Sequence, residues 1–369
     1  MQLKVLVVDD TVLFRKIVSD VISSLPNAEL VGTASNGSIA MRRLQELCPD
    51  IMILDIEMPG MNGIQVLEAI KNQSLDVGVI MLSSLTVKGG DMTVKALQLG
   101  AFDFITKPTG TSIEDSRTRI RSALEPMLSA YGRQREIQLI LKGKHAPTHT
   151  PQILRPQSPA ADPLSVTQRM MKIAQNSKSE LVLIGISTGG PNALSEMLPK
   201  LPGDINVPLL IVQHMPPTFT QSLAKSLDAK CAIHVKEAED NEKVLPNTAY
   251  IAPGGTQMKL ILHNGQKTIR ITDDPPENNC KPAVDYLFRS AAHNFPGKTT
   301  AVIMTGMGRD GTLGLQLIKR NGSVSIAQDE SSCIVFGMPK EAIQAGVVDI
   351  IAPLDRIADE IIKTVRRIK

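Results

Sequence analysis

The 369-residue sequence predicts two doubly wound α/β domains joined by a linker. Its length exceeds that of one ordinary domain, which has about 100 to 200 residues. Short apolar runs alternate with helical patterns in both halves, and this alternation is typical of a parallel sheet with helices on both faces. A proline-rich stretch interrupts the pattern between the halves. We therefore expect a first domain over residues 1–125, a linker over 126–178 and a second domain over 179–369.

The first half contains several apolar runs of strand length. Helical segments such as SIAMRRLQELC and GIQVLEAIK separate these runs. Because a helix between two strands allows them to lie parallel, the pattern predicts a (βα)5 domain with an open parallel sheet. The expected strands are LKVLVV, AELVGTA, IMILD, VGVIMLS and DFITK.

The stretch between the two domains is basic at first and then rich in proline. Proline lacks a backbone N–H and fixes its own φ angle, so recurrent prolines interrupt both helices and sheets. We expect a linker here, with any helix confined to its ends. The prolines are Pro147, Pro151, Pro156, Pro159 and Pro163.

The strand and helix alternation resumes after Glu180. The runs KLILH and KTIRIT flank the turn sequence NGQ, which predicts a β-hairpin. The second domain is therefore expected to have a mainly parallel sheet with an antiparallel hairpin at its edge. Its other expected strands are LVLIGIS, VPLLIVQH, NTAYIAP, TTAVIMTG and SVSIAQD.

Composition restricts the classes of function. A hydrophobic fraction of 42% with a net charge of +3 fits a soluble globular protein and argues against a nucleic-acid binder that relies on bulk positive charge. The N-terminal sequence MQLKVLVVDD has neither the pattern of a signal peptide nor the roughly 20 apolar residues of a membrane span. We expect a cytoplasmic protein that does not insert into membranes.

The four cysteines are widely spaced and form no CxxC motif. Neither a metal knuckle nor a disulfide framework is indicated by such spacing. We expect reduced, partly buried thiols. The cysteines are Cys48, Cys231, Cys280 and Cys333.

Polar residues follow four of the expected strands in the first domain: Asp9 and Asp10, then Asp55, Ser83 and Lys107. Ligands bind at the carboxyl ends of parallel strands, where these side chains would converge. Clustered carboxylates repel one another unless a hard cation such as Mg²⁺ joins them. A lysine and a hydroxyl would then hold the oxygens of a phosphoryl group on one aspartate. Taken singly, such an aspartate is more often a helix cap and such a lysine a solvated charge.

The motifs VVDD, LDIEMPGMNG, MLSS and FDFITKP resemble those of the receiver domain of response regulators, in the same order. The resemblance covers roughly the first 125 residues. It implies a phosphorylated aspartate, a Mg²⁺ site and two side chains that contact the phosphoryl group. These would be Asp55 as the phosphoacceptor, Asp9, Asp10 and Asp55 as metal ligands, and Ser83 and Lys107 as the phosphoryl contacts.

The same resemblance implies two further roles. Phe104 stands at the position of the family's rotameric switch aromatic, although it lacks the hydroxyl of the more common tyrosine. The backbone carbonyl of Glu57 would complete the Mg²⁺ shell.

A glycine-rich turn in the second domain carries a serine. The segment LVLIGISTGGPNAL runs from an expected strand into a helix with Pro191 near its first turn, a position that proline favours. Ser187 would lie at the helix N-terminus, where free N–H groups favour developing negative charge. Gly185, Ser187 and Gly189 satisfy GxSxG, but this pattern also fits a turn that only packs a helix or binds a phosphate.

A histidine and an aspartate follow two other expected strands. His214 ends VPLLIVQH, and Asp310 lies in a second glycine-rich turn after TAVIMTGMGR. A serine nucleophile needs a base, and the base needs a carboxylate that fixes its tautomer, so Ser187, His214 and Asp310 could form a triad. In isolation, such a histidine is more often structural and such an aspartate a turn residue. The Ser, His, Asp order differs from that of α/β-hydrolases.

The motifs IGISTGGPNAL, VQHMPPTFT, YIAPGG and MTGMGRDG resemble the catalytic domain of chemotaxis protein-glutamate methylesterases and glutaminases. The resemblance covers nearly all of residues 180–369. It implies that Ser187 is the nucleophile, His214 the general base and Asp310 its orienting partner. It also implies that the oxyanion is flanked by Thr188 and the turn around Met307.

Both resemblances together predict a phosphorylation-activated hydrolase of glutamate γ-methyl esters, with glutamine deamidation as a second activity. The implied partners are a chemotaxis histidine kinase and methyl-accepting chemoreceptors. Mg²⁺ is expected in the receiver domain, and no cofactor is expected for ester hydrolysis.

Two alternatives remain open at this point. The chain could be a receiver-controlled hydrolase of another ester. It could instead be a noncatalytic, phosphorylation-dependent binding module whose Ser187 turn holds an anion. A DNA-binding regulator is disfavoured, because no helix-turn-helix or basic recognition helix follows the first domain.

Overall fold

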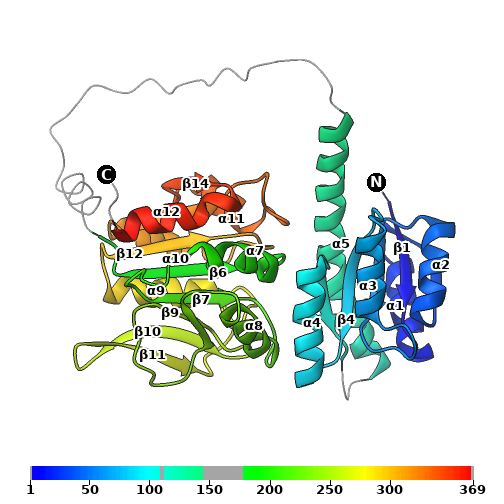
Figure 1. Ribbon diagram of the computed structural model, residues 1–369, viewed down its shortest axis with the longest axis horizontal. Coiled ribbons are helices and arrows are strands. Elements are labelled where there is room, and N and C mark those ends of the chain that lie inside the picture. Colours follow the sequence, from blue (N-terminus) through cyan, green and yellow to red (C-terminus); the bar gives the residue numbers. More distant parts are fainter. Residues whose placement is uncertain (1, 109–111, 144–177, 367–369) are drawn as a thin grey trace.

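The computed structural model describes residues 2–108, 112–143 and 178–366. Two α/β domains lie side by side, and the proline-rich part of the expected linker falls outside the described residues (Figure 1). Among the helices of these residues, none is both long and apolar enough to cross a membrane.

The first domain is built on a parallel sheet with the strand order β2-β1-β3-β4-β5. All of its predicted strands are confirmed. Both faces of the sheet are covered by helices, which is why the strands read as continuous apolar runs. The strands are β1 (Leu3–Val8), β2 (Ala28–Ala34), β3 (Ile51–Asp55), β4 (Gly78–Ser83) and β5 (Asp103–Thr106).

Local capping residues define where several of its helices begin. Asn36 accepts a hydrogen bond from the Ile39 N–H, and Asn62 forms a capping box with Gln65. The helix after β5 continues well beyond residue 125, so the predicted end of the first domain falls inside it. The helices are α1 (Val12–Ser23), α2 (Gly37–Leu47), α3 (Gly63–Asn72), α4 (Val87–Leu99) and α5 (Ile113–Gly143).

The second domain has a seven-stranded sheet with the order β14-β13-β12-β6-β7-β9-β8, in which all neighbours are parallel. The two edge strands β8 and β14 are short and were not predicted. The strands are β6 (Leu181–Ile186), β7 (Leu209–Gln213), β8 (His234–Glu237), β9 (Thr248–Ile251), β12 (Thr299–Ile303), β13 (Val324–Gln328) and β14 (Ile350–Ala352).

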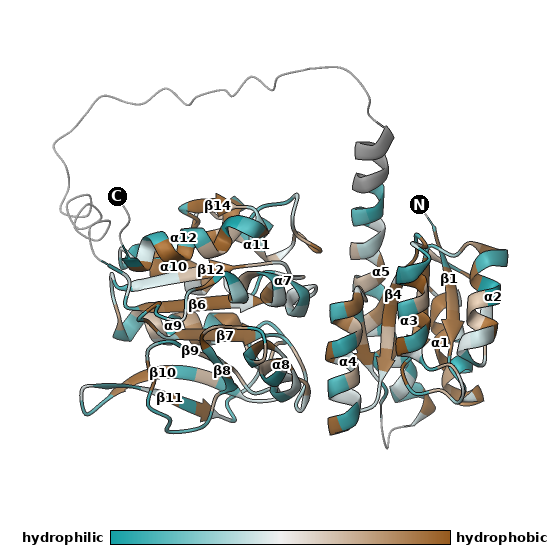
Figure 2. Ribbon diagram, viewed as in Figure 1, coloured by the Kyte–Doolittle hydropathy of each residue, from teal (hydrophilic) through white to brown (hydrophobic). Residues whose placement is uncertain are grey.

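Helices cover both faces of this sheet, and the brown strands between paler helices in Figure 2 show the buried apolar layer. Every residue of β6, β7 and β12 is buried. The helices are α7 (Gly190–Met197), α8 (Phe219–Asp228), α9 (Val284–Asn294), α10 (Thr312–Arg320), α11 (Met338–Gln344) and α12 (Leu354–Arg366), with a 3₁₀ turn at Leu198–Lys200.

The predicted hairpin is confirmed as β10 (Gln257–His263) and β11 (Gln266–Thr272). It forms its own two-stranded sheet, however, and does not extend the edge of the seven-stranded one. Its buried residues pack in the core beneath α9, and the Leu260 N–H donates to Ser290 Oγ on that helix at 3.0 Å. The hairpin is therefore held mainly by packing against a helix. The alternation of apolar residues along the chain cannot predict which element a strand packs against.

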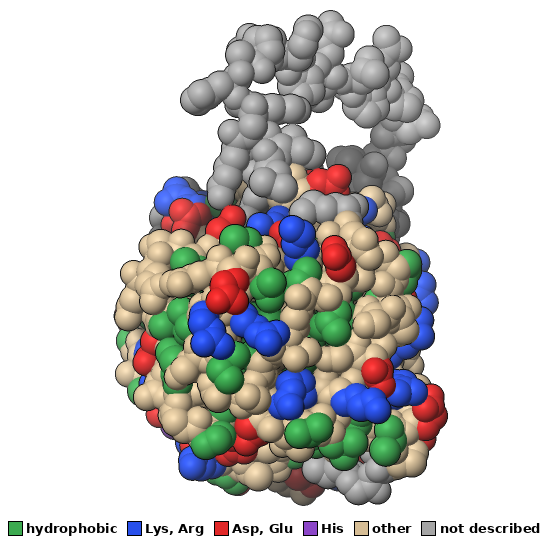
Figure 3. All heavy atoms as spheres, turned by 90° about the vertical axis from the view of Figure 1, so that its right-hand side faces the viewer, with side chains coloured by type: hydrophobic (Ala, Val, Ile, Leu, Met, Phe, Trp, Pro, Cys, Tyr) green, Lys and Arg blue, Asp and Glu red, His purple; other side chains and the backbone are tan. Residues whose placement is uncertain are grey.

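The outer face of the first domain carries Lys and Arg side chains interspersed with Asp and Glu (Figure 3). Mixed charges of this kind are typical of an ordinary solvated surface. The opposite side of the domain, with α4 and β5, contacts α7 and α8 of the second domain.

Candidate functional sites

Ser187 lies in the sharp turn between β6 and α7. Its N–H donates to the carbonyl of Thr305 at 3.0 Å, and its own carbonyl accepts from the Gly190 N–H at 2.8 Å. Gly189 has φ of +77°, a conformation that favours glycine. A Cβ at Gly190 would lie 1.9 Å from Gln213 Oε1, so a larger residue here would have to displace the buried Gln213 side chain. The turn thus brings Ser187 to the carboxyl edge of the sheet.

His214 and Asp310 meet at the same edge. His214 directly follows β7, and its Nε2 lies 2.8 Å from Asp310 Oδ2. The Asp310 side chain is buried, whereas that of His214 is 13% exposed. With Nε2–H donating to the carboxylate, the lone pair of a neutral His214 is on Nδ1.

Asp310 is held by groups that sequence reasoning missed. Its Oδ2 accepts from the Val284 N–H at 2.7 Å, and its Oδ1 accepts from the Asp285 N–H and from Asn278 Nδ2, both at 3.0 Å. The donors come from the N-terminus of α9 and the loop before it. A polar residue such as Asn278 in a loop gives no local sequence signal of this role, because the loop reaches the site only in the folded chain.

The electrostatics of the pair favour an ionised carboxylate beside the imidazole. Burial would raise the pKa of Asp310, but hydrogen bonds from His214, Asp285 and Val284 hold it below its usual value. Burial likewise lowers the pKa of His214, but hydrogen bonds to Asp310 and to Cys280 outweigh this effect and raise it to about 9. Cys280 was not singled out in the sequence, yet its Sγ lies 3.6 Å from His214 Nδ1.

Ser187 and His214 line one cavity of about 250 Å³ at the boundary between the domains. Within the described parts of the chain, no hydrogen bond joins their side chains. Thr188 lies on the same wall. The N–H groups of Thr188 and Met307 have no hydrogen-bond acceptor among the described residues. Gly306, next to Met307, lies beside Ser187, since a Cβ added to Gly306 would be 2.7 Å from Ser187 Cβ. The oxyanion role expected for Thr188 and the Met307 turn therefore stays a prediction.

The first domain forms the other wall of this cavity. Its contribution comes from the C-terminal part of α4, from β5 and from α5. Phe104 of β5 stacks on Phe219 of α8 with ring centroids 4.8 Å apart. Asp103 lines the same cavity as Thr188, the residue after Ser187, and burial raises the pKa of the Asp103 carboxyl to about 6. The first-domain residues lining the cavity are Leu97, Asp103, Phe104, Ile105, Thr106, Ala123 and Met127.

The second sequence-predicted site lies at the carboxyl edge of the first sheet. Asp9 and Asp55 are both buried, and Lys107 Nζ lies 2.8 Å from Asp9 Oδ2 and 2.7 Å from Asp55 Oδ2. Burial is the largest influence on Asp55 and raises its pKa to about 6, although Lys107 opposes that shift. Asp10 is exposed beside them.

The carboxylates fit a hard divalent cation. Oxygen atoms of Asp9, Asp10 and Asp55 lie within 4.8 Å of one another, and oxygen ligands of this kind suit Mg²⁺. Glu57 follows on the same loop, where its N–H donates to Asp55 Oδ1 at 3.3 Å. The residues expected to hold the metal are therefore brought together.

Ser83 lies at the end of β4 but is engaged elsewhere. Its buried Oγ accepts a hydrogen bond of 2.6 Å from Thr93 Oγ1 on α4 and lies 3.4 Å from the carbonyl of Gly89 on the same helix. Phe104 is also buried, with its ring against Phe219. The hydroxyl expected to contact a phosphoryl group is thus tied to α4, the helix that packs on the second domain.

Comparison with known proteins matches both domains. The family model described as response regulator receiver domain matches residues 5–119, and that described as CheB methylesterase matches residues 182–361. A protein from Desulfotalea psychrophila named protein-glutamate methylesterase/protein-glutamine glutaminase is 51% identical over 366 residues, covering 99% of each chain. One of the same name from Clostridium acetobutylicum is 39% identical over 368 residues, covering 100% of this chain and 99% of its own.

A solved structure supports the fold of the second domain. The CheB methylesterase catalytic domain of Thermotoga maritima is 44% identical, with a TM-score of 0.50, and the alignment covers 51% of this chain and 99% of that one. The predicted resemblances of both domains are therefore confirmed. With a receiver domain followed by a CheB methylesterase domain, and with relatives matched over its whole length, the chain belongs to the family of protein-glutamate methylesterases/protein-glutamine glutaminases.

Proposed function

We propose that the chain hydrolyses glutamate γ-methyl esters of methyl-accepting chemoreceptors with a Ser187, His214 and Asp310 triad, under control of phosphorylation at Asp55. The observation that carries the proposal is the 2.8 Å contact between His214 Nε2 and a buried Asp310, with Ser187 in the same cavity. The family relationship supports the substrate class.

In the first half of the reaction, Ser187 Oγ attacks the ester carbonyl while His214 takes its proton. With Nε2–H donating to Asp310, the accepting nitrogen is Nδ1. Asp310 keeps this tautomer and stabilises the imidazolium that forms. The N–H groups of Thr188 and Met307 are our candidates for binding the oxyanion. Collapse of the tetrahedral intermediate returns the proton from His214 to the leaving methoxy oxygen, and methanol departs.

In the second half, water attacks the acyl-enzyme with His214 again acting as base. This step releases the glutamate carboxylate and restores the Ser187 hydroxyl. A glutamine side chain offers the same carbonyl geometry with an amide in place of the ester. Deamidation by the same residues would release ammonia, and we expect it to be slower because an amine is the poorer leaving group.

Phosphorylation is assigned to Asp55, with a chemotaxis histidine kinase as the donor. Asp9, Asp10, Asp55 and the carbonyl of Glu57 would hold Mg²⁺, which neutralises the charge of the incoming phosphoryl group. Lys107 already lies 2.7 Å from Asp55 Oδ2 and would contact a phosphoryl oxygen. No cofactor is proposed for ester hydrolysis.

We further propose that the unphosphorylated receiver restrains the esterase by covering it. The first domain forms one wall of the cavity that contains Ser187 and His214. Gln98 Nε2 on α4 donates to Ser226 Oγ on α8 at 2.6 Å, and the Phe104–Phe219 stack lies next to the cavity. A receptor segment would have to displace these contacts to reach Ser187.

The hydroxyl of Ser83 offers a route from Asp55 to this interface. If Ser83 turns to bind a phosphoryl oxygen, its 2.6 Å contact with Thr93 is lost, and the position of α4 changes with it. Phe104 can then leave Phe219 for space vacated near Ser83. Both changes weaken the contacts between the receiver and the esterase domain.

The test is methanol release from methylated receptor by the purified full chain, with and without a small-molecule phosphodonor and Mg²⁺. We expect release to increase with the phosphodonor. Methanol release that Ser187→Ala leaves intact would refute the triad. Release that is abolished by Ser187→Ala but insensitive to the phosphodonor would refute only the proposed control.

A further inference from the structure

A cysteine thiol faces the ring nitrogen of His214 that is not bound to Asp310. Cys280 Sγ lies 3.6 Å from His214 Nδ1, and ligand atoms of Cys280, His214 and Asp310 all lie within 4.8 Å of one another. We propose that Cys280 and His214 form a binding site for Zn²⁺ or a similar thiophilic divalent cation, and that the bound cation switches off the esterase.

The distance between the two ligand atoms matches a zinc site. A Zn–S bond of about 2.3 Å and a Zn–N bond of about 2.0 Å that meet at a tetrahedral angle place sulfur and nitrogen about 3.5 Å apart. The 3.6 Å separation of Cys280 Sγ and His214 Nδ1 is close to this value. A soft thiolate with an imidazole is a donor set that Zn²⁺ prefers over Mg²⁺.

Asp310 is suited to support this site without binding the metal directly. Its two oxygens already accept hydrogen bonds from His214, Val284, Asp285 and Asn278. A carboxylate that accepts from the distal N–H of a metal-binding histidine fixes the ring and makes the other nitrogen more basic. The remaining coordination positions would be filled by water or a solute from the adjacent cavity.

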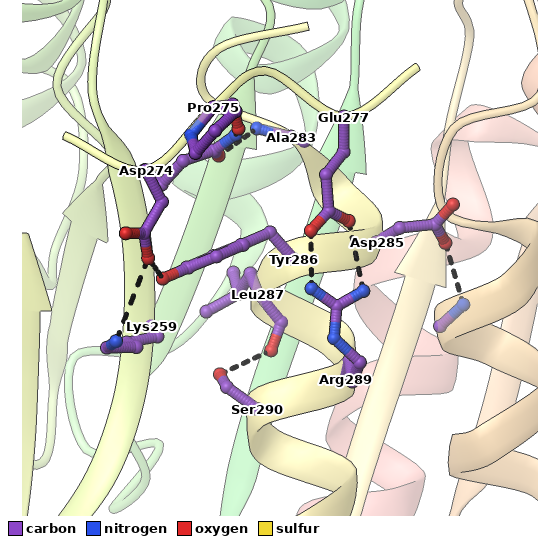
Figure 4. A network of polar contacts seen from close by, with 12 residues as sticks. Lys259, Asp274, Pro275, Glu277, Ala283, Asp285, Tyr286, Leu287, Arg289 and Ser290 are labelled. Atoms are coloured by element: carbon purple, nitrogen blue, oxygen red, sulfur yellow. Dashed lines mark hydrogen bonds and ion pairs between the residues drawn. The ribbon is translucent and has the colours of Figure 1, made fainter. Parts of the chain in front are cut away.

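The loop that carries Cys280 is held on several sides. Glu277 forms an ion pair with Arg289 of α9 through both carboxylate oxygens, and Asp274 accepts a hydrogen bond from the hydroxyl of Tyr286 (Figure 4). The backbones of Glu277 and Cys280 also hydrogen-bond to each other in both directions, at 3.1 and 2.8 Å. Cys280 is thereby kept beside His214 and does not need to be ordered when a cation binds.

Two of the other cysteines are poor metal ligands. Burial raises the pKa of Cys231 to about 11 and that of Cys333 well above its usual range, so both thiols resist deprotonation. Cys48 is exposed on the first domain, far along the chain from any of these groups. Cys48 therefore provides the control variant for the tests of cation binding and inhibition.

The inhibitory effect rests on the proposed role of His214 as base, whereas metal binding itself does not. Binding replaces the thiol proton of Cys280 and occupies the Nδ1 lone pair of His214. His214 then cannot accept the proton of Ser187, and hydrolysis stops until the cation is removed.

Binding is tested with Co²⁺ as a spectroscopic substitute for Zn²⁺, added to the full chain under reducing conditions. A thiolate bound to Co²⁺ gives a charge-transfer absorption band in the near ultraviolet, whereas the oxygen ligands of Asp9, Asp10 and Asp55 give none. We expect the band in the wild type and in Cys48→Ser, and its loss in Cys280→Ser and in His214→Gln. Persistence of the band in Cys280→Ser, or its absence from the wild type, overturns the site.

Inhibition is tested by titrating Zn²⁺ against methanol release, with each variant compared with its own rate at zero Zn²⁺. We expect the midpoint to rise at least tenfold in Cys280→Ser, to be unchanged in Cys48→Ser, and a chelator to restore the wild-type rate. An equal midpoint in Cys280→Ser overturns the proposed inhibition. A cobalt band without any esterase activity would instead refute the proposed function and leave the metal site standing.

Discussion

Asp310 and Asp55 are both buried near the carboxyl ends of parallel strands, and their surroundings differ in one respect. Asp310 accepts hydrogen bonds from two backbone N–H groups, from Asn278 and from His214, and its pKa is held below the usual value. Asp55 has one long backbone hydrogen bond and the ammonium of Lys107, and burial raises its pKa to about 6.

The difference fits the roles proposed for the two carboxylates. Fixed backbone donors keep Asp310 charged and stationary, which suits a residue that orients a base. Asp55 is bound by a flexible lysine and lies among other carboxylates, which suits a group whose partners change when a metal and a phosphoryl group arrive. On this proposal, the hydrogen bonds around Asp310 stay in place during catalysis, whereas those around Asp55 are exchanged during regulation.

The largest effect is expected at the triad. Ser187→Ala or His214→Ala should reduce methanol release by roughly 10⁴-fold or more, because each removes a group that reacts. Asp310→Asn should retain more activity than either, since Asp310 only orients His214. Circular dichroism checks that the fold is intact. A folded Ser187→Ala protein with the wild-type rate would contradict the assignment.

The second prediction concerns pH. The base must be neutral, and the pKa of His214 is raised to about 9, so its neutral fraction is small at pH 7 and grows with pH. We expect kcat/KM for methanol release to rise by about tenfold per pH unit from pH 7 and to level off near pH 9. Ser187→Ala at each pH corrects for spontaneous ester hydrolysis. A profile that is flat above pH 7 would show that the hydrogen bonds to His214 do not govern the reaction.

The third prediction separates the proposed roles of the Asp55 site and of the triad. Asp55→Ala should abolish stimulation by a phosphodonor and preserve the basal rate, because Asp55 contacts none of the triad residues. A chelator should have the same effect on the wild type, since the metal is proposed only for phosphorylation. The measurement is methanol release with and without phosphodonor. Loss of the basal rate in chelator would mean that the esterase itself needs a metal.

The smallest effect is expected at the domain interface. A Cβ at Gly90 of α4 would lie 3.0 Å from Ser222 Oγ on α8, so Gly90→Leu should push the helices apart. If the contact between the domains is weakened by about 1.4 kcal/mol, the fraction of molecules with an uncovered esterase rises up to tenfold. Basal methanol release should increase by the same factor. Lys95→Leu, on the same helix but paired with Glu68 of the receiver, is the control. An unchanged basal rate in Gly90→Leu would argue against inhibition by covering.

The sequence by itself determined most of the strands, although not β8 and β14, and the polar residues that follow them. Asp55, Ser187 and His214 each come directly after an apolar run or at its end, and a parallel sheet necessarily brings such positions to one edge. The motifs could therefore be assigned without coordinates. The NGQ turn of the hairpin could also be predicted, because asparagine and glycine favour the positive φ angles that such a turn demands. Asn264 and Gly265 both adopt these angles.

Tertiary structure alone decided which side chains reach these sites from elsewhere. Cys280 and Asn278 lie on a loop more than 60 residues from His214 in the chain, and their path depends on the packing of α9. Ser83 was predicted to contact a phosphoryl group, but its bond to Thr93 follows from how α4 packs on the sheet. The periodicity of apolar residues reports only which face of an element is buried, so it carries no information about such contacts.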